Sequence, residues 1–309
     1  MKINLANIKK AKKFLKLNEC VGIPTETVYG LAANAYSDIA CKKIFKLKKR
    51  PKNNPLIVHY YKIENLREDC TFNNDFLKLY KKFCPGPITF ILDLKKKSKI
   101  SKIATNRKNT LAVRFPKHPV TRNLLKDLKF PLAAPSANLS SKVSAVSYSD
   151  VKEDFGKKIK YVLQGGKSSI GVESTIIDLR NKPKILRLGG LEVSSIQKVL
   201  NKKIFIKNNP RKISAPGQLK LHYSPGIPLR LNVKKAKSNE AYILIKKKKI
   251  KPNYYFLSKK NNLKEAAKNL YSTLRKIKKS KYKSIVVQKI SNKGLGGTIN
   301  DRLKRASKF

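Results

Sequence analysis

The chain has 309 residues, of which 40% are hydrophobic and 29% charged, a composition typical of a folded globular protein. At about 150 residues per domain, this length predicts two domains. No apolar run approaches the roughly 18 residues that a membrane-spanning helix needs, and the basic N-terminal segment lacks the apolar stretch and cleavage site of a signal peptide. We therefore expect a cytoplasmic protein with no membrane partner.

The cysteine content argues against zinc-finger and disulfide-rich proteins, and the charge content is unusual. No two of the four cysteines, Cys20, Cys41, Cys70 and Cys84, form a C-x-x-C pair, and the chain has three histidines. We therefore expect reduced thiols and no structural metal. The 72 basic and 18 acidic residues give a net charge of +54, and 60 of the basic residues are lysine. Two interpretations stay open: a coding bias toward lysine, or a surface for a polyanion such as RNA.

Apolar periodicity predicts the helices of the first part of the chain. Apolar residues at helical spacing after Asn7, a candidate N-cap, predict an opening helix up to Leu17. A second helix, capped by Ser37 or Asp38, is expected to end before Pro51. Further helices are expected over residues 72–83 and 120–128.

Short apolar runs predict the strands. The first, over 20–23, ends at Pro24 and leads into a loop over 25–30. The others are expected over residues 56–59, 88–94, 111–115, 131–134, 161–163, 174–178 and 185–188. Helices alternate with only some of these strands, so we expect one mixed-sheet α/β domain over residues 1–207.

A proline-rich segment separates this domain from a smaller one. Residues 208–228 contain four prolines and two glycines without a hydrophobic period, which predicts a linker. Beyond it, strands over 241–245 and 284–287 flank a helical pattern over 263–274, so residues 229–309 predict a small α/β domain. The lysine run 246–249 is expected to be a solvated turn.

Polar segments between the apolar runs are candidates for binding. Arg50 opens an Arg-Pro-x-x-Asn-Pro loop at a helix end, which is either a helix cap or a rigid donor set for phosphate oxygens. No glycine-rich phosphate loop is present in the sequence. Ser, Thr and Asn crowd three further segments, APSAN (134–138), GVEST (171–175) and KILRLGG (184–190), each of which taken alone is more typical of a turn than of a binding site.

Taken together and in order, the motifs PTETVYGL, KKRPKNNPLIVH, CPGPITFIL, LAVRFPKHP, APSANLS, GVESTIIDL and ILRLGG resemble the YrdC/Sua5 family of threonylcarbamoyl-AMP synthases. The linker's SAPGQLKLHYSP and the terminal GLGGTINDRLKRA resemble its longer, Sua5-type branch. The resemblance implies a YrdC-like twisted mixed sheet with a concave basic face and a small Rossmann-like C-terminal domain. It also implies an activity: condensation of L-threonine, bicarbonate and ATP to threonylcarbamoyl-AMP and pyrophosphate.

The resemblance further implies partners and site residues. A downstream transferase machinery would pass the threonylcarbamoyl group to adenosine 37 of tRNAs that read codons beginning with A. The residues implied for L-threonine are Thr27, His59, Arg114, Ala134 and Ser174. Those implied for ATP are Lys48, Arg50, Asn54, Thr110, Ser136, Ser144, Arg187, His222 and Tyr223, of which Lys48 and Arg50 are the expected catalytic pair.

The chemistry of these residues agrees with the implied ligands. Arg114, on a strand that also carries Thr110 on the same face, can bind a carboxylate bidentately. Lys48, Arg50 and Arg187 can offset the charge of a triphosphate, whose oxygens would hold Mg²⁺ without a protein ligand. The motif carboxylates Glu26 and Glu173 receive no general-base role, and no covalent nucleophile is required.

Two rival functions and three departures accompany this interpretation. A non-catalytic RNA-binding protein would also explain the charge, and the carbamoyl-transfer domain of hydrogenase maturation factors shares the fold, although its zinc-finger and acylphosphatase segments are absent.

His118 is expected to be a helix-entry residue. Lys49 stands where the family has a small residue, Leu188 stands near a family proline, and the C-terminal domain is short. We expect that domain mainly to anchor the linker as a lid over the site.

Overall fold

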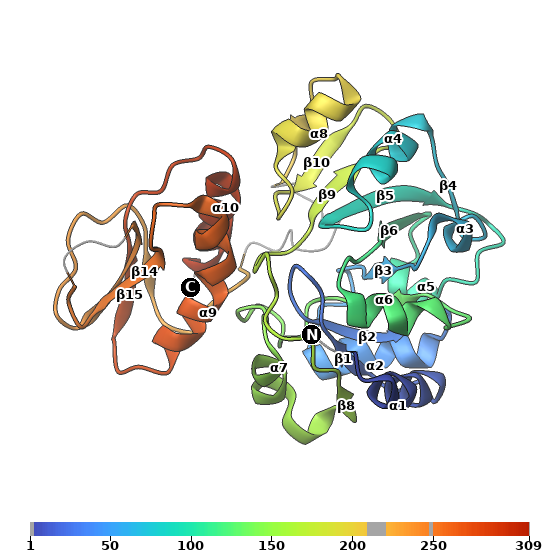
Figure 1. The fold of residues 1–309 in the computed structure, drawn as a ribbon, viewed down its shortest axis with the longest axis horizontal. Coiled ribbons are helices and arrows are strands. Elements are labelled where there is room, and N and C mark those ends of the chain that lie inside the picture. The colour runs from blue at the N-terminus through green and yellow to red at the C-terminus, as the bar shows by residue number, and fades with distance from the viewer. Residues whose placement is uncertain (1–2, 209–220, 247–249, 309) are drawn as a thin grey trace.

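The computed structural model describes residues 3–208, 221–246 and 250–308, and shows two sheet-containing bodies joined through α9 and α10 (Figure 1). In the larger body the elements are α1 (Leu5–Lys16), β1 (Val21–Ile23), β2 (Gly30–Asn34), α2 (Asp38–Lys48), β3 (Ile57–His59), α3 (Ile63–Leu66), β4 (Cys70–Thr71), α4 (Asn74–Phe83), β5 (Ile88–Leu94), α5 (Lys102–Thr105), β6 (Thr110–Arg114), α6 (Pro119–Lys126), β7 (Leu132–Ala133), α7 (Tyr148–Phe155), a 3₁₀ turn (Gly156–Lys158), β8 (Tyr161–Val162), β9 (Thr175–Asp178), β10 (Lys184–Arg187), α8 (Val193–Leu200) and β11 (Phe205–Ile206).

One mixed sheet organises the larger body. Its strand order is β11-β10-β9-β5-β6-β3-β7-β2-β1-β8, with β4 beside β5. The central strands pair in both directions: β6 is antiparallel to β5 and parallel to β3. Their apolar residues are buried on both faces, as in β5, where Ile88 to Leu92 are all buried. This confirms the predicted α/β class with a mixed sheet.

Most predicted elements are present, with bounds that differ by at most four residues. The strand over 88–94 coincides with β5, Ser37 caps α2 through its side chain, and His118 is the N-cap of α6 as expected. The prediction of Asn7 as the first N-cap is wrong: the side chain of Asn4 accepts from Asn7 N, so α1 begins three residues earlier than predicted.

Some of the short elements were not predicted. The loop predicted over 25–30 ends in an unpredicted strand, β2, whose sequence GLAAN has no β-branched residue. It is a strand because it lies between β1 and β7 and is buried there. The four-residue helices α3 and α5 are too short to show a period of 3.6 residues.

The smaller body contains β12 (Leu229–Arg230), β13 (Glu240–Lys246), β14 (Tyr254–Ser258), α9 (Leu263–Lys278), β15 (Ser284–Val287) and α10 (Leu295–Ala306). Its four strands are parallel in the order β12-β15-β13-β14, which agrees with the expected Rossmann-like domain. The strands β12 and β14 and helix α10 were not predicted. Of the expected lysine turn, Lys246 is the exposed end of β13 and residues 247–249 lie outside the described part.

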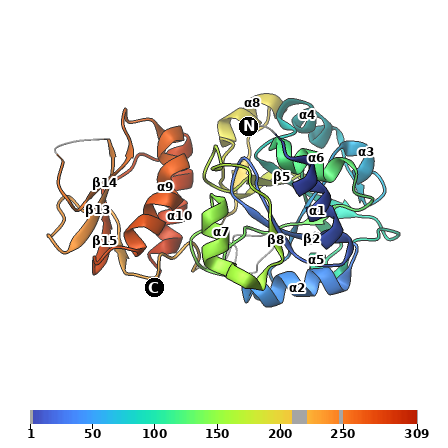
Figure 2. The same ribbon diagram turned by 60° about the horizontal axis from the view of Figure 1, so that its bottom comes forward.

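The two bodies share a hydrophobic core. Helices α9 and α10 are the part of the smaller body that faces the larger one, and they lie beside α7 of the larger body (Figure 2). Val28, Val143, Val146 and Val172 of the larger body are buried in one cluster with α9 and α10. The division at residues 207 and 228 stays a prediction, because residues 209–220 of the expected linker lie outside the described part. Within the described residues, no helix is both long and apolar enough to span a bilayer.

The C-terminal end of α2 explains one departure from the family motifs. Lys49, which is exposed, adopts a left-handed conformation with φ of 49°. A residue with a Cβ pays about 1 kcal/mol for this conformation, whereas glycine does not. A small residue is therefore favoured here, and lysine keeps the turn at a cost.

Replacing Lys49 tests this explanation. Lys49→Gly is expected to raise the free energy of unfolding by about 1 kcal/mol because it removes the left-handed strain. The matched variant Lys46→Gly, at an exposed position inside the same helix, is expected to lower it by about 1 kcal/mol. Thermal unfolding of both variants measures the difference, and a fall in both would contradict the assignment.

Candidate functional site

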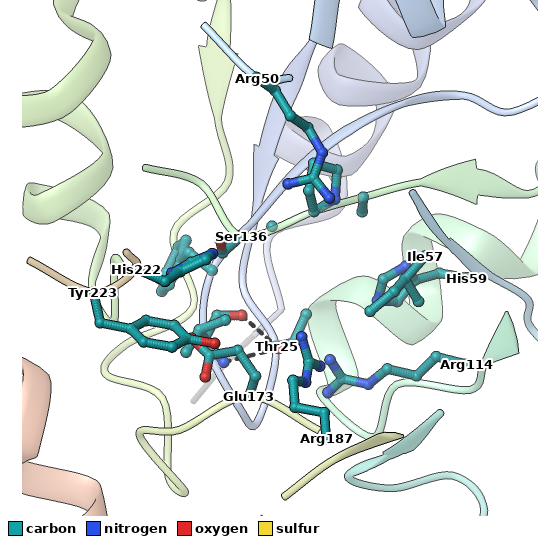
Figure 3. A pocket seen from close by; sticks show the side chains of 15 residues that line it. Thr25, Arg50, Ile57, His59, Arg114, Ser136, Glu173, Arg187, His222 and Tyr223 are labelled. Atoms are coloured by element: carbon teal, nitrogen blue, oxygen red, sulfur yellow. Dashed lines mark hydrogen bonds between the residues drawn. The ribbon is translucent and has the colours of Figure 1, made fainter. Parts of the chain in front are cut away.

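A pocket opens over the middle of the large sheet, where loops from several strands converge (Figure 3). It encloses about 500 Å³ of empty space, part of it open to solvent. The residues that line it are Thr25, Val28, Tyr29, Gly30, Arg50, Ile57, His59, Arg114, Ala134, Pro135, Ser136, Glu173, Arg187, His222 and Tyr223.

A hydroxyl-rich turn after β1 forms one wall. The Thr25 hydroxyl donates to Val28 O at 2.5 Å and lies 2.9 Å from the Thr27 hydroxyl. Thr27 is fully buried behind Thr25. The turn is thus held by its own side chains, which fixes the positions of both hydroxyls before any ligand enters.

Arg114 at the end of β6 is held by Glu26. Its Nη2 donates to Glu26 Oε1 at 2.7 Å, and Glu26 Oε2 accepts from Lys117 N at 3.0 Å. Both side chains are buried. Glu26 is thus an orienting partner of the arginine, a role that the sequence left unassigned. One edge of the guanidinium is fixed by the carboxylate, and Nε has no hydrogen-bond partner among the described residues.

The end of α2 places two buried cations at the site. Lys48 Nζ donates to Ser136 O at 2.5 Å and also to Asn138 O. Arg50 donates to Asn54 O at 2.9 Å and to Asn54 Oδ1 at 2.7 Å. Burial lowers the pKa of Lys48 well below its usual value, and burial together with Arg187 lowers the pKa of Arg50 to about 9.

Arg187 reaches the pocket from β10, which is separated from the central strand β5 by β9. Its Nε and Nη2 donate to Ser174 O at 3.0 and 2.9 Å, and Nη2 also donates to the Ser174 hydroxyl at 3.1 Å. The Ser174 hydroxyl is 2.7 Å from that of Thr89. Arg187 and Ser174 therefore act as one unit, and the guanidinium points into the same space as that of Arg114 (Figure 3).

Glu173 is the acidic member of the lining. Its Oε1 accepts from the Ser144 hydroxyl at 2.6 Å, and its Oε2 accepts from Tyr271 OH at 2.9 Å and Arg302 Nε at 2.8 Å. Burial alone would raise the pKa of Glu173, but Arg302 and Arg187 outweigh it and hold that pKa at about 2. The side chain is therefore ionised.

Two residues of the linker close the pocket. His222 and Tyr223 are buried, with ring centroids 3.9 Å apart, and Tyr223 stacks on Tyr271 of α9 at 5.6 Å. Burial, together with Arg50 and Lys48, lowers the pKa of His222 to about 3, so its ring is neutral. The described end of the linker is thus packed onto the site.

Unsatisfied polar atoms indicate a polar ligand. Among the described residues, the pocket-lining atoms that are buried without a hydrogen-bond partner are His59 Nδ1, Arg114 Nε, His222 Nδ1 and Tyr223 OH. Leaving such an atom unpaired costs about 1–3 kcal/mol. With three arginines and one carboxylate in the lining, the pocket favours an anion that pairs with these atoms.

The structure brings most of the residues implied by the resemblance to this pocket. Eight line it: Arg50, His59, Arg114, Ala134, Ser136, Arg187, His222 and Tyr223. Thr27, Lys48, Asn54, Ser144 and Ser174 lie behind lining residues and bond to them. Thr110 lies at the far end of β6 from Arg114, half-buried and outside the lining. The ligand roles of all of them stay predictions.

Sequence reasoning missed the groups that hold the site in place. Thr25 and Tyr29 stand in the first motif but were not singled out, while Tyr271 and Arg302 come from the C-terminal domain. The motif GLGGTINDRLKRA was the only available signal for Arg302. No group of three or more His, Cys, Asp or Glu side chains among the described residues is arranged to hold a metal ion.

Comparisons with known proteins agree with this geometry. Residues 13–189 match the Sua5/YciO/YrdC family, described as "Telomere recombination", and residues 191–308 match the "Threonylcarbamoyl-AMP synthase, C-terminal domain" family. The threonylcarbamoyl-AMP synthase of Pyrococcus abyssi is 34% identical, with 98% of this chain and 94% of that protein covered. The chain belongs to the YrdC/Sua5 family.

Other relatives support the same membership. The Bacillus subtilis threonylcarbamoyl-AMP synthase is 34% identical over 98% of this chain and 94% of its own length. The crystal structure of P. abyssi Sua5 complexed with L-threonine superposes with a TM-score of 0.92 at 33% identity, covering 99% of this chain and 96% of that one. A HypF structure, 22% identical with a TM-score of 0.54, covers 60% of this chain and 29% of that one and shares the fold alone.

One departure from the family motifs is resolved by the contacts. Leu188, which stands near a family proline, packs its side chain against the main hydrophobic core, and its backbone carbonyl accepts from Arg302 Nη2 at 2.6 Å. A proline also has a carbonyl oxygen, so the exchange keeps this acceptor.

The buried histidine of β3 predicts a pH dependence of stability. Burial, then Arg114, lowers the pKa of His59 to about 3, against about 6.5 in the unfolded chain. The unfolded state therefore binds more protons between these values, and stability falls by up to about 1.4 kcal/mol for each pH unit below 6.5.

His59→Gln is expected to remove this contribution. Melting temperatures of the two proteins at pH 7.5 and pH 5.0 measure it, and the drop between the two pH values is expected to be smaller in the variant. An equal drop in both would show that His59 is protonated normally in the folded chain.

Proposed function

We propose that this chain is a threonylcarbamoyl-AMP synthase that condenses L-threonine, bicarbonate and ATP and releases pyrophosphate. The carrying observation is one pocket lined by three buried arginines and several unpartnered polar atoms, in a chain related over almost its whole length to proteins of that name. The P. abyssi Sua5 crystal structure, which contains L-threonine, supports an amino acid in the corresponding pocket.

The threonine carboxylate would bind to the free edge of Arg114. Glu26 accepts from Nη2 of that guanidinium, and Nε has no partner among the described residues. His59 Nδ1 is a second unpartnered atom at the same wall, and the Ala134 segment and the Ser174 hydroxyl complete the proposed subsite. Thr27 supports it through Thr25. The amine would then face the interior of the pocket.

ATP would enter as its Mg²⁺ complex, with the metal held by phosphate oxygens rather than by protein side chains. The cations Lys48, Arg50 and Arg187 would offset the phosphate charge. His222 and Tyr223 would cover the nucleotide from the linker side, with Asn54, Ser136 and Ser144 supporting the same wall. For Thr110, the resemblance is the support for a nucleotide contact.

The reaction needs shelter and alignment more than a nucleophilic residue. Bicarbonate takes up a proton and loses water to give carbon dioxide. The threonine amine adds to the carbon of carbon dioxide and becomes a carbamate, and the proton that it gives up balances the one that bicarbonate takes up. A carbamate oxygen attacks the α-phosphorus of ATP as the bond to the β-phosphate oxygen breaks, and pyrophosphate leaves. The buried rings of His222 and Tyr223 exclude water from the resulting mixed anhydride.

The product would serve tRNA modification. We propose that a separate transferase machinery passes the threonylcarbamoyl group to adenosine 37 of tRNAs that read codons beginning with A. The net charge of +54 is compatible with direct tRNA contact, and also with a composition bias that has no such role.

Threonine-dependent pyrophosphate release tests the proposed function. The purified chain is incubated with threonine, bicarbonate and MgATP, and release is compared with reactions lacking threonine. Release above that background is expected. A folded chain that shows none, yet binds tRNA, would instead support the non-catalytic RNA-binding alternative.

The cations at the end of α2 give a first prediction. Lys48→Ala and Arg50→Ala are each expected to lower pyrophosphate release by about a hundredfold, because a preorganised donor to developing charge is worth roughly 3 kcal/mol. Lys52→Ala, an exposed lysine on the same loop, is the matched control and is expected to retain activity. Near-normal turnover in both test variants would place the nucleotide elsewhere.

Arg114 gives a different kinetic signature. Arg114→Ala is expected to raise the KM for threonine first, because its proposed partner is the substrate carboxylate. The KM for ATP is measured in the same variant and is expected to change less. A rise confined to ATP would contradict the assigned subsite.

A further inference from the structure

The C-terminal helix α10 reaches the pocket wall through a residue that the proposed function does not use. Arg302 has a side chain with no exposed surface, and its Nε donates to Glu173 Oε2 at 2.8 Å. Its Nη2 donates to Leu188 O at 2.6 Å. Glu173 lines the pocket and Arg302 lies behind it, so the arginine acts on the pocket only through its neighbours.

The same guanidinium supports the linker. Its central carbon lies 4.9 Å from the centre of the Tyr223 ring, and Tyr223 also stacks on Tyr271. Tyr271 OH is the second donor to Glu173 Oε2. Two side chains of the C-terminal domain therefore contact both a carboxylate of the pocket wall and an aromatic ring of the lid.

A third contact shows that α10 is fitted to this place. Thr298, one turn before Arg302, donates its hydroxyl to Gly189 O at 3.0 Å. Gly189 packs so closely on the backbone of residues 173–175 that an added Cβ would lie 2.3 Å from Ser174 C. Helix α10 therefore donates hydrogen bonds to the backbone carbonyls of Leu188 and Gly189, the two residues that follow Arg187.

Charge gives these contacts a function. The pocket is suited to an anionic nucleotide, and an uncompensated carboxylate in its wall would repel that ligand. Glu173 faces Arg302, Tyr271, Ser144, Arg187, His222 and Tyr223. Of these, Arg302 is the cation in direct contact with the carboxylate, since Arg187 bonds to Ser174.

We propose that Arg302 is a positioning residue for the reaction, which neutralises Glu173 and fixes its carboxylate in the wall of the nucleotide pocket. The sequence predicts that the C-terminal domain mainly anchors the linker. On this proposal the domain has a second role, because it also supplies the positive charge that neutralises a carboxylate of the pocket wall. This inference rests on the proposed function, because it assumes an anionic nucleotide in the pocket.

The test compares the KM for ATP in wild type and in the variants Arg302→Met, Glu173→Gln, Arg302→Met/Glu173→Gln, Arg302→Lys and Arg305→Met. Arg302→Met is expected to raise it about tenfold at pH 8, because Glu173 then carries an unneutralised charge beside the phosphates. The rise is expected to shrink toward pH 5.5, since burial without Arg302 lets Glu173 take up a proton. In wild type and in the control Arg305→Met, another buried arginine of α10, no such pH dependence is expected.

The double variant Arg302→Met/Glu173→Gln separates this role from a structural one. Gln is neutral and keeps an acceptor oxygen, so the KM for ATP is expected to return to within about threefold of wild type and to lose its pH dependence. Arg302→Lys, which keeps the charge, is expected to resemble wild type in pH dependence. If Arg302→Met does not fold, recovery of folding in the double variant is the expected result, since both charges of the Glu173–Arg302 pair are gone and Asp301, the second carboxylate on Arg302, keeps its pairing with Arg305.

The outcomes distinguish the two proposals. An inactive wild-type chain would overturn the proposed function. An active wild type whose Arg302→Met and Glu173→Gln effects on the KM for ATP simply add would overturn only the role of Arg302. The same holds if Arg302→Met lowers kcat equally at every pH, or if neither the single nor the double variant folds.

Discussion

Compensation of buried positive charge is the constraint on which this structure depends. Lys48, Arg50, Arg114, Arg187 and Arg302 are all buried within one region, where an unpaired charge is strongly destabilising. Backbone carbonyls accept from Lys48, Arg50 and Arg187, while carboxylates pair with Arg114 and Arg302. The loops adopt the conformations that bring these acceptors inward.

The positively charged side chains therefore fall into two groups, one on the surface and one buried around the pocket. Most of the 60 lysines are on the surface, where solvent and salt screen them, and their number says little about the site. The buried cations are mainly arginines, whose forked donors reach two acceptors at once, as Arg187 does at Ser174 and Arg50 at Asn54. A small number of buried groups, and not the total of +54, therefore gives the pocket its preference for anions.

The sequence predicted those helices and strands that have a local apolar period, and those site residues that lie in recognisable motifs. The apolar runs of β5 and the capped helix α2 stood out because neighbouring residues along the chain determine them. Helix α10 did not, because three glycines near its start lower helix propensity. Gly296 is required by the close approach of the turn before the helix, since an added Cβ would lie 1.9 Å from Ser291 O. Likewise, no local pattern distinguishes the buried Arg302 from an exposed arginine.

The core shared between the two bodies has a consequence for folding. Valines of the loops around the pocket pack in one cluster with the apolar residues of α9 and α10, such as Leu270 and Ile299. Removing the C-terminal domain would expose this face to water, where it would favour self-association. In this chain the loops around the pocket and the C-terminal helices are buried in one hydrophobic cluster, so separation of the smaller body would expose residues that also pack the pocket wall.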